Sequence, residues 1–327
     1  GPLGSLQTMR VIHGGGSAAT LIARDDADII CATRQSIVGK DFTATKQRLK
    51  PLLAHPTVVV VDEAHHAVAP TYRQLLDHIQ KTAPAVLMLG LTATPWPAGT
   101  GMTALLHKRF PTRVVDVDTT SLVASNILAR PIIHSLATDE DIWLSDAELK
   151  AATWGDLPAS VLRKFDKYSR NRLIVDTWLA QKATWGKTLV FACDIAHAET
   201  LGELFREAGV KVAVVHSMSG QSAAPALMTF RNAKSPRVLV SADMLREGVD
   251  LPDARTAFLA RPTRSPIVLR QMIGRVLRGP LAGGDSAAHI VDLRDRWRDE
   301  VEILSPLDVP NLEPKTSSDG SPGEALF

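Results

Sequence analysis

Short runs of apolar residues alternate with amphipathic stretches along most of this chain. The run over residues 57–61 reads TVVVV, is β-branched throughout and is too short to span a membrane, so it predicts a buried strand of a parallel sheet. Residues 27–33 and 85–91 predict two further strands. Between the strands at 57–61 and 85–91, residues 70–81 carry apolar positions at helical spacing after a leading proline and predict a crossover helix. This order predicts a right-handed βαβ unit.

The second half of the chain repeats the alternation. An amphipathic pattern over 159–182 places Phe165, Tyr168, Val175 and Trp178 or Leu179 on one helical face. We assign this aromatic stripe to the core and not to a base-stacking platform. Apolar runs and amphipathic stretches then alternate as expected for a second parallel α/β domain. The predicted strands are 188–192, 210–215, 237–241, 256–260 and 287–291, and the predicted helices are 195–208, 223–232 and 265–277.

The chain is long enough for two domains with cores of their own, since it has 327 residues. The fold class we predict is α/β, with two parallel-sheet domains in tandem. Composition sets the boundaries. We read 1–5 as a cloning scar, 6–135 as the first domain, the acidic stretch 136–160 as an interdomain linker, 161–298 as the second domain and the proline-rich stretch 299–327 as a disordered tail.

Composition narrows the class of protein. Hydrophobic residues make up 45% and charged residues 22%, with no apolar run near the ~20 residues of a spanning helix, so we expect a cytoplasmic protein without a membrane partner. The net charge is only +2, so nucleic-acid binding would need a local basic track. Cys31 and Cys193 are far apart and lack metal-ligand spacing, which predicts buried free thiols in a reducing compartment.

Two carboxylates follow the TVVVV strand. Asp62 and Glu63 stand at its carboxyl end, the edge at which open α/β sheets bind ligands. Taken alone, such a pair more often caps the next helix. The neighbouring His65 and His66 do not predict a transition-metal site, because no third ligand is spaced to join them.

The context of this acidic pair is a series of motifs in fixed order. Asp62-Glu63-Ala64-His65 resembles the DEAH box of superfamily 2 helicases, and Thr92-Ala93-Thr94 resembles motif III. SADMLREGVD and QMIGRVLRG resemble motifs V and VI. The chain is most similar to the branch that contains the helicase subunits of type III restriction enzymes and related DNA-repair helicases, over roughly residues 9 to 295. The resemblance implies two RecA-like domains, the first truncated at its N-terminus.

The resemblance also implies roles for the DEAH segment. Asp62 would hold Mg²⁺, mostly through water, and Glu63 would orient or deprotonate the attacking water of ATP hydrolysis. His65 would couple this nucleotide site to motif III through Thr92 and Thr94. No role is assigned to His66.

Motif VI would supply cations. Gln271, Arg275 and Arg278 match the QxxGRxxR pattern, and steps of four and three would place them on one helical face. Without the other motifs, two such arginines are more often a solvated surface. The resemblance implies arginine fingers that reach ATP across an interdomain cleft, with Gly248 and Asp250 of motif V contacting nucleotide and metal.

Nucleic-acid contacts are implied on both domains. Thr33 and Arg34 match a phosphate-binding motif in the first domain, although Thr33 alone would read as a helix cap. Ser241 and the loop after Phe191 match backbone contacts in the second. Such phosphate contacts predict strongly salt-dependent and sequence-independent binding. We expect DNA rather than RNA as the ligand, because the proteins that the chain resembles act on DNA.

The phosphate loop of this family is missing. The triple glycine at 14–16 lacks the GxxxxGK[ST] string, and Gly186-Lys187-Thr188 precedes a strand, with Gln181 where the first glycine is required. Three explanations stay open: a fragment, a separate N-terminal segment or subunit that supplies the loop, or a non-hydrolysing nucleic-acid-binding or assembly module. We favour an ATP-dependent DNA helicase or translocase core that is inactive alone, with the DEAH strand left at an unpaired sheet edge.

Overall fold

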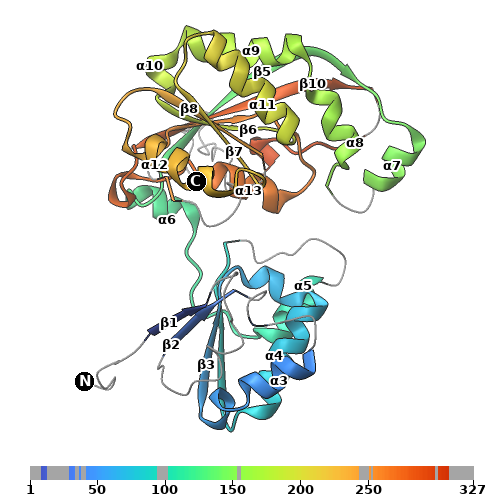
Figure 1. Ribbon diagram of the computed structural model, residues 1–327, viewed down its shortest axis with the longest axis vertical. Helices are drawn as coiled ribbons and strands as arrows, with labels where there is room; N and C mark the ends of the chain where they lie inside the picture. The colour runs from blue at the N-terminus through green and yellow to red at the C-terminus, as the bar shows by residue number, and fades with distance from the viewer. Residues whose placement is uncertain are drawn as a thin grey trace, which may run out of the picture. The chain divides into compact units, whose positions relative to one another are not determined.

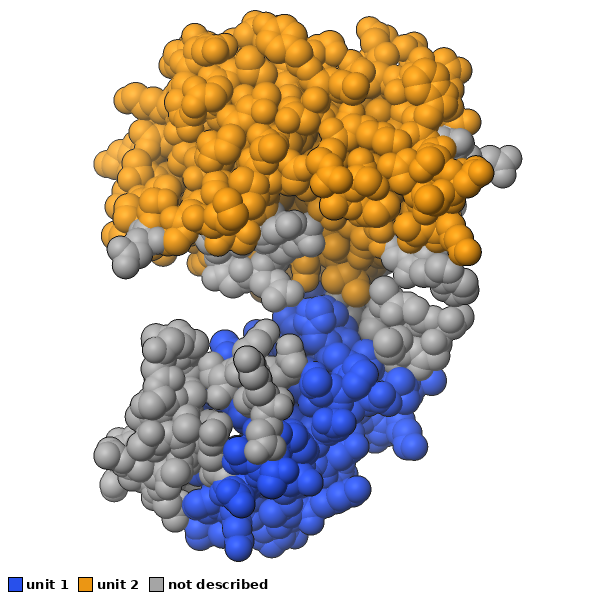
Figure 2. Space-filling view, turned by 45° about the vertical axis from the view of Figure 1, so that its right-hand side comes forward, with its two compact units in different colours: residues 1–114 blue, residues 115–327 orange. Residues whose placement is uncertain are grey.

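The chain folds into two compact units, residues 1–114 and 115–327, which we describe separately (Figure 2). Both are built from parallel strands and helices, which confirms the predicted α/β class. The computed structural model describes residues 9–12, 29–33, 37, 42–93, 102–152, 156–242, 250–251, 253–298 and 301–308.

Unit 1 contains the predicted βαβ element. β3 (Thr57–Val61) pairs in parallel with β4 (Val86–Gly90), and α4 (Pro70–Thr82) connects them. Proline at the first turn of α4 fits the helix because its missing N–H has no partner to lose there. A second parallel pair joins β1 (Met9–Ile12) to β2 (Ile29–Ala32). Helices α3 (Phe42–Leu49) and α5 (Met102–Arg109) complete the unit.

The core of unit 1 lies on one face of its strands. Leu75, Leu76 and Ile79 of α4 form a cluster with Val61, against which Val59 also packs. The alternate residues of β3 point the other way and are exposed, contrary to our prediction of a fully buried strand. The reason is visible in Figure 1, where α3, α4 and α5 all lie on the same side of these strands.

Unit 2 is built on a six-stranded parallel sheet with strand order β5-β10-β9-β6-β8-β7. Its strands are β5 (Arg130–Ile142), β6 (Lys187–Phe191), β7 (Val212–His216), β8 (Arg237–Ala242), β9 (Thr256–Leu259) and β10 (Ala287–Trp297). Its α-helices are α6 (Thr119–Ala124), α7 (Asp146–Ala152), α8 (Ala159–Leu162), α9 (Tyr168–Ala180), α10 (Lys182–Trp185), α11 (Ile195–Glu207), α12 (Ala223–Asn232) and α13 (Pro266–Gly274).

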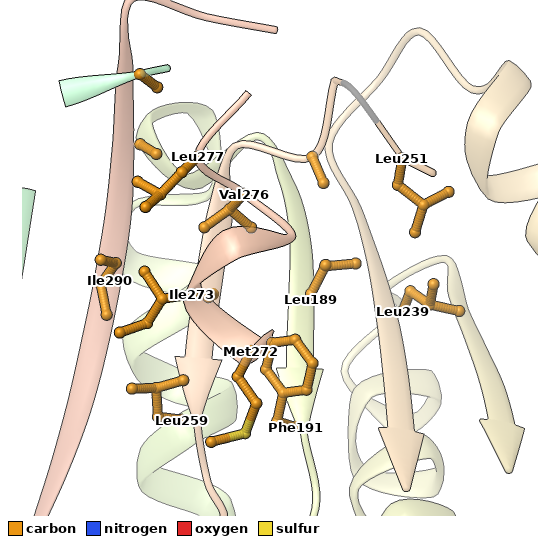
Figure 3. Packing of buried hydrophobic residues seen from close by; sticks show 14 of the residues in the cluster. Leu189, Phe191, Leu239, Leu251, Leu259, Met272, Ile273, Val276, Leu277 and Ile290 are labelled. Atoms are coloured by element: carbon orange, nitrogen blue, oxygen red, sulfur yellow. The ribbon is translucent and has the colours of Figure 1, made fainter. Parts of the chain in front are cut away.

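Both faces of this sheet are covered. Along β6, Leu189 belongs to a cluster that includes Met272 and Ile273 of α13, shown in Figure 3. The next residue, Val190, belongs to a second cluster with residues of α9 and α11, including Phe205. Alternation along a strand buried on both sides explains why these strands read as continuous apolar runs.

The unit boundary differs from the expected domain boundary. Residues 136–142, which we expected in an interdomain linker, belong to the edge strand β5, which pairs with β10. Their acidic character misled the prediction, because edge positions tolerate charge. The predicted helix over 159–182 is divided into α8, a 3-10 turn, α9 and α10. In its aromatic stripe Phe165 and Trp178 are buried as predicted, whereas Tyr168 is 72% exposed.

The predicted disordered tail begins as ordered structure. Ser305 is 1% exposed and its hydroxyl donates to Asp292 Oδ2 at 3.0 Å, while the Leu304 N–H donates to the Thr263 carbonyl at 3.0 Å. These contacts hold residues 301–308 against unit 2. The rest of the predicted tail lies outside the described residues.

A buried ion pair ties α9 to the sheet. Arg170 donates through Nε and Nη2 to Asp295 at 2.8 and 3.1 Å, and the Thr138 hydroxyl donates to the same carboxylate at 2.6 Å. The two charged side chains are 0% and 1% exposed. Removal of one partner would therefore leave a buried charge without its counter-ion.

We predict that Asp295→Ala lowers the free energy of unfolding of unit 2 by about 3–5 kcal/mol, because Arg170 loses its carboxylate in a dry environment. Asp176→Ala is the matched control, since Asp176 pairs with Arg172 on the exposed side of the same helix α9. The control should change stability by less than about 0.5 kcal/mol. Urea unfolding monitored by circular dichroism measures both, and a loss below about 1 kcal/mol for Asp295→Ala would contradict the assignment.

Candidate functional site

The acidic pair stands on a tight turn at the end of β3. Glu63 adopts a left-handed backbone conformation, with φ 48° and ψ 50°, which is uncommon for a residue other than glycine. Its N–H donates to Asp62 Oδ1 at 2.9 Å. The turn leaves the Asp62 side chain exposed and the Glu63 side chain half-buried at the carboxyl end of the strand, as the sequence predicts.

His65 joins this turn to the end of β4. Its Nδ1 lies 3.0 Å from Thr92 Oγ1 and 3.3 Å from Glu63 Oε2, and the residue is only 3% exposed. The structure thus brings together three residues that the sequence singled out from two separate motifs. His66 is exposed, and Thr94 lies outside the described residues.

Close packing between the two strand ends makes this contact possible. A Cβ at Gly90 would lie 2.9 Å from Ala64 Cβ and 3.1 Å from the Phe110 ring. The Ala64 N–H donates to the Leu91 carbonyl at 2.8 Å. Any side chain at position 90 would push the acidic turn away from β4. Gly90 was not among the residues predicted from the sequence, although a glycine inside a strand signals a close approach.

The predicted motif VI helix is shorter than expected. α13 begins after Ser265, whose hydroxyl accepts from the Val268 N–H at 3.3 Å, and ends at Gly274. Gln271 lies on the helix and Arg275 at its C-cap, both half-buried. The prediction that Arg278 shares their helical face is wrong, because Arg278 lies beyond the helix in an antiparallel bridge with Leu128.

Arg278 contacts a motif V residue. Its Nη2 lies 3.3 Å from Asp250 Oδ1, with side-chain exposures of 38% and 62%. A pair this exposed contributes only about 0–1 kcal/mol, so its effect is to orient the guanidinium group more than to stabilise the unit. Two of the predicted nucleotide-binding residues of unit 2 therefore lie together. Gly248 lies outside the described residues.

The chain just before β5 braces this arginine. Gly279 donates its N–H to the Ile127 carbonyl at 2.9 Å, and Ala129 donates to the Leu277 carbonyl at 3.2 Å. A Cβ at Gly279 would lie 2.4 Å from the carbonyl oxygen of Asn126, which itself has a φ of 56°. Sequence analysis missed this brace because it assigned residues 126–129 to the first domain.

A second missed residue is Asp156, which we expected in the linker. Its Oδ1 accepts from the Thr263 hydroxyl at 2.8 Å and from the Arg264 N–H at 2.9 Å. Its Oδ2 accepts from Arg261 Nη2 at 2.8 Å. Three bonds to one carboxylate fix the loop that leads from β9 into α13. Nothing local in the sequence indicates this partner, which is more than 100 residues away.

The predicted nucleic-acid residues have different environments. Thr33 is exposed just after β2, whereas Phe191 is 4% and Ser241 is 1% exposed. The last two are register partners at the ends of β6 and β8. Both side chains are buried, and the nucleic-acid contacts expected of Ser241 and of the loop after Phe191 stay predictions. Arg34 lies outside the described residues.

Two titratable groups beyond β6 are neutral parts of the core. Burial lowers the pKa of His197 to about 3, and its Nδ1 accepts from the Cys193 N–H at 3.2 Å. Burial raises the pKa of the Cys193 thiol to about 12, which excludes it as a nucleophile at neutral pH. Cys31 is exposed, so the prediction of two buried thiols holds only for Cys193.

The donors at the acidic turn suit a hard cation that keeps most of its waters. Asp62 offers an exposed carboxylate of which only one oxygen accepts a backbone N–H, and Mg²⁺ prefers oxygen ligands. Within the described residues, no three His, Cys, Asp or Glu side chains gather as a metal-binding cluster. Among the helices in this part of the chain, none has the length and apolar character needed to span a bilayer.

Family models match both units. Residues 6–96 match the type III restriction enzyme res subunit, and residues 169–280 match the helicase conserved C-terminal domain. The ATP-dependent helicase IRC3 of Saccharomyces cerevisiae is 28% identical over 82% of this chain and 37% of its own length. A 51.5 kDa protein of a Lactococcus phage is 28% identical over 74% of this chain and 49% of its own length. The chain thus spans less than half the length of these relatives.

Solved structures share the fold. An HsdR subunit fragment of a type I restriction enzyme from Vibrio vulnificus aligns with a TM-score of 0.63 at 20% identity, over 89% of this chain and 50% of its own. The restriction-modification enzyme LlaBIII bound to DNA aligns with a TM-score of 0.58 at 16% identity, over 92% and 23%. Dbp5 from S. cerevisiae, bound to RNA, aligns with a TM-score of 0.51 at 15% identity, over 88% and 64%.

We predict that Gly279→Ala destabilises unit 2 by about 1–3 kcal/mol, because the added methyl group would meet the Asn126 backbone. Gly274→Ala, five residues away, is the control, because its Cβ would meet nothing within 4 Å. The control should be neutral or stabilising by up to about 1 kcal/mol. Denaturant unfolding compares the two variants, and equal stability would show that the brace is not tight.

Proposed function

We propose that this chain, a relative of the superfamily 2 helicases in the branch of the type III restriction enzyme helicase subunits, is the motor core of an ATP-dependent DNA helicase or translocase. The observation that carries the proposal is the contact of His65 with both Glu63 and Thr92 at the carboxyl ends of β3 and β4. That contact connects a candidate hydrolytic carboxylate to the strand end that would sense the state of the nucleotide.

Asp62, Glu63 and His65 of unit 1 would have separate roles in ATP hydrolysis. Asp62 would hold Mg²⁺ through water, and the ion would supply positive charge to the phosphates of ATP. Glu63 would orient the attacking water and accept its proton. The Glu63 backbone is left-handed, and its Oε2 lies 3.3 Å from His65 Nδ1, a contact that would limit rotation of the carboxylate. Movement of Glu63 on hydrolysis would then change the hydrogen bond between His65 and Thr92.

Charge stabilisation would come from unit 2. Arg275 and Arg278 are the candidate arginine fingers, and loss of one would lower the rate by about 10³-fold or more. The Asp250 carboxylate now orients Arg278, and a γ-phosphate would compete with it for the guanidinium group. Gln271 would complete the set from α13. This step requires the two units to close around one nucleotide. Gly248 and Asp250 of motif V would contact that nucleotide and its metal from the same unit as the arginines.

The polymer that we assign is DNA. Two restriction enzymes are among the proteins of the same fold, one of them bound to DNA. Contacts to its phosphates would come from Thr33 and Arg34 on unit 1 and from Ser241 and the loop after Phe191 on unit 2. Since the net charge is +2, binding would rest on local phosphate contacts and would weaken steeply with salt.

A phosphate loop must be added for this chemistry. The 327-residue sequence contains no GxxxxGK[ST] string. The loop would come from outside it, either from another part of a longer chain of which this is a fragment or from a separate N-terminal segment or subunit. The same observation favours one alternative of another class, a helicase-derived module that binds nucleic acid or an assembly partner without hydrolysing ATP.

We predict that the chain alone hydrolyses ATP no faster than the buffer. Adding a separately expressed segment that carries a GxxxxGK[ST] loop between a strand and a helix, together with Mg²⁺ and single-stranded DNA, should restore turnover. Glu63→Gln should lower that turnover by about 10²–10⁴-fold, because the general base is lost. Glu203→Gln, at an exposed glutamate of α11, is the control and should leave it unchanged. Phosphate release measures all four states, and no turnover after complementation would favour the non-hydrolysing module.

A further inference from the structure

A groove of about 410 Å³ lies at the amino end of β7, which is an edge strand of the six-stranded sheet. Its lining comes from the last turn of α11, the start of β7, α12 and the first residue of β8. We call it the basic groove, because three of the described residues that line it are the cations Arg206, Lys211 and Arg237, and none of them is acidic. Its volume falls within the range of ~300–1,000 Å³ that is typical of ligand pockets.

The charge of the basic groove comes from a long stretch of sequence. Residues 208–242 contain Lys211, Arg231, Lys234 and Arg237 but no aspartate or glutamate. The whole chain, in contrast, has nearly equal numbers of basic and acidic residues, 37 and 35. An edge strand often carries a lysine that prevents pairing with other strands. One charge would serve that purpose, whereas here three cations line one concave surface.

Local contacts position the two arginines. A Cβ at Gly202 would lie 2.4 Å from a β7 side chain, so this glycine lets the last turns of α11 approach the strand. Arg206 Nη1 lies 2.5 Å from the 66% exposed Glu203 carboxylate. Arg237 donates from Nη1 to the Thr229 carbonyl at 3.2 Å, and its buried Nε has no hydrogen-bond partner within the described part of the chain. The guanidinium group of Arg237 therefore keeps donor capacity for a ligand.

The rest of the lining decides which kind of anion fits. Most of these residues are aliphatic and half-buried, namely Val210, Val212, Ala213 and Ala226. An occupant would remove this apolar surface from water. A phosphodiester backbone gains nothing from such a contact. An acidic peptide does gain, because its carboxylates can meet the cations while an apolar side chain packs against the aliphatic groups.

We propose that the basic groove is the docking site for an acidic peptide segment of a partner protein, in which carboxylates flank an apolar side chain. The carboxylates pair with Lys211 and Arg237, and the apolar side chain packs against Val212 and Ala226. The site is separate from the proposed ATP chemistry, because Ser241, a candidate DNA contact, lies at the carboxyl end of β8 and the groove lies at the amino end. A partner bound here would leave the carboxyl edge of the sheet free.

The test measures the fluorescence anisotropy of a fluorescein-labelled peptide, EEELFEEE, mixed with the 327-residue chain. The peptide should bind saturably, and EEESSEEE should bind about 10-fold or more weakly, because it lacks the apolar pair. Lys211→Glu and Arg206→Glu should each weaken binding by about 5-fold or more, because attraction for the carboxylates becomes repulsion. Lys150→Glu makes the same charge change at an exposed lysine of α7 and should leave the affinity within about 2-fold.

Both substituted groove residues are exposed, so the variants should fold, and Lys211→Gln offers a milder change if they do not. Four results would overturn the inference: no saturable binding of EEELFEEE up to about 1 mM, equal binding of the two peptides, equal effects of Lys211→Glu and Lys150→Glu, or displacement of the peptide by a single-stranded oligonucleotide whose own binding Lys211→Glu weakens. The last result would make the groove a DNA contact. No readout involves ATP turnover, so the proposed function stands or fails separately.

Discussion

Parallel pairing of β3 with β4 is the constraint on which the candidate site depends. The pairing places both carboxyl ends at one edge, and Gly90 lets the two ends approach until Ala64 touches β4. Only then can the buried His65 reach Glu63 and Thr92 together. The energy of these two contacts is modest, but they fix the direction of a carboxylate. A rigid strand pair thus turns residues 29 positions apart into one polar cluster.

In unit 2, hydrogen bonds between residues distant in the sequence position the candidate arginines. Arg278 lies on no helix or strand of its own, so its position depends on the hydrogen bonds between 127–129 and 277–279. Asp156 likewise fixes the loop that starts α13. Each candidate cation is therefore set by chain segments outside its own motif. Asp156 lies in the stretch that looks like a linker in the sequence, which shows that such a stretch can carry part of the geometry of a site.

The sequence predicted what is local. The TVVVV strand, its helix and the alternation in unit 2 were confirmed because apolar periodicity reports burial directly, and the carboxylates of residues 62 and 63 do lie at the strand end. The sequence did not predict strand β5, the residue at which α13 ends or the contacts of Asp156. In these cases the deciding partner is about 100 residues away or more, and the partner of Arg278, Leu128, was assigned to the first domain. The sequence also did not predict the one-sided core, since TVVVV looks the same whether one face or two are covered.

We propose that the carboxylates of unit 1 and the arginines of unit 2 act on one nucleotide. A spin-label distance measurement tests it most directly, with labels at Gln74 of α4 and Thr200 of α11 in a Cys31→Ser background, because buried Cys193 resists labelling. With the complementing segment and DNA present, Mg²⁺ and a non-hydrolysable ATP analogue should shorten and narrow the distance distribution, and Arg278→Ala should reduce the effect. An unchanged distribution with nucleotide bound would contradict the account.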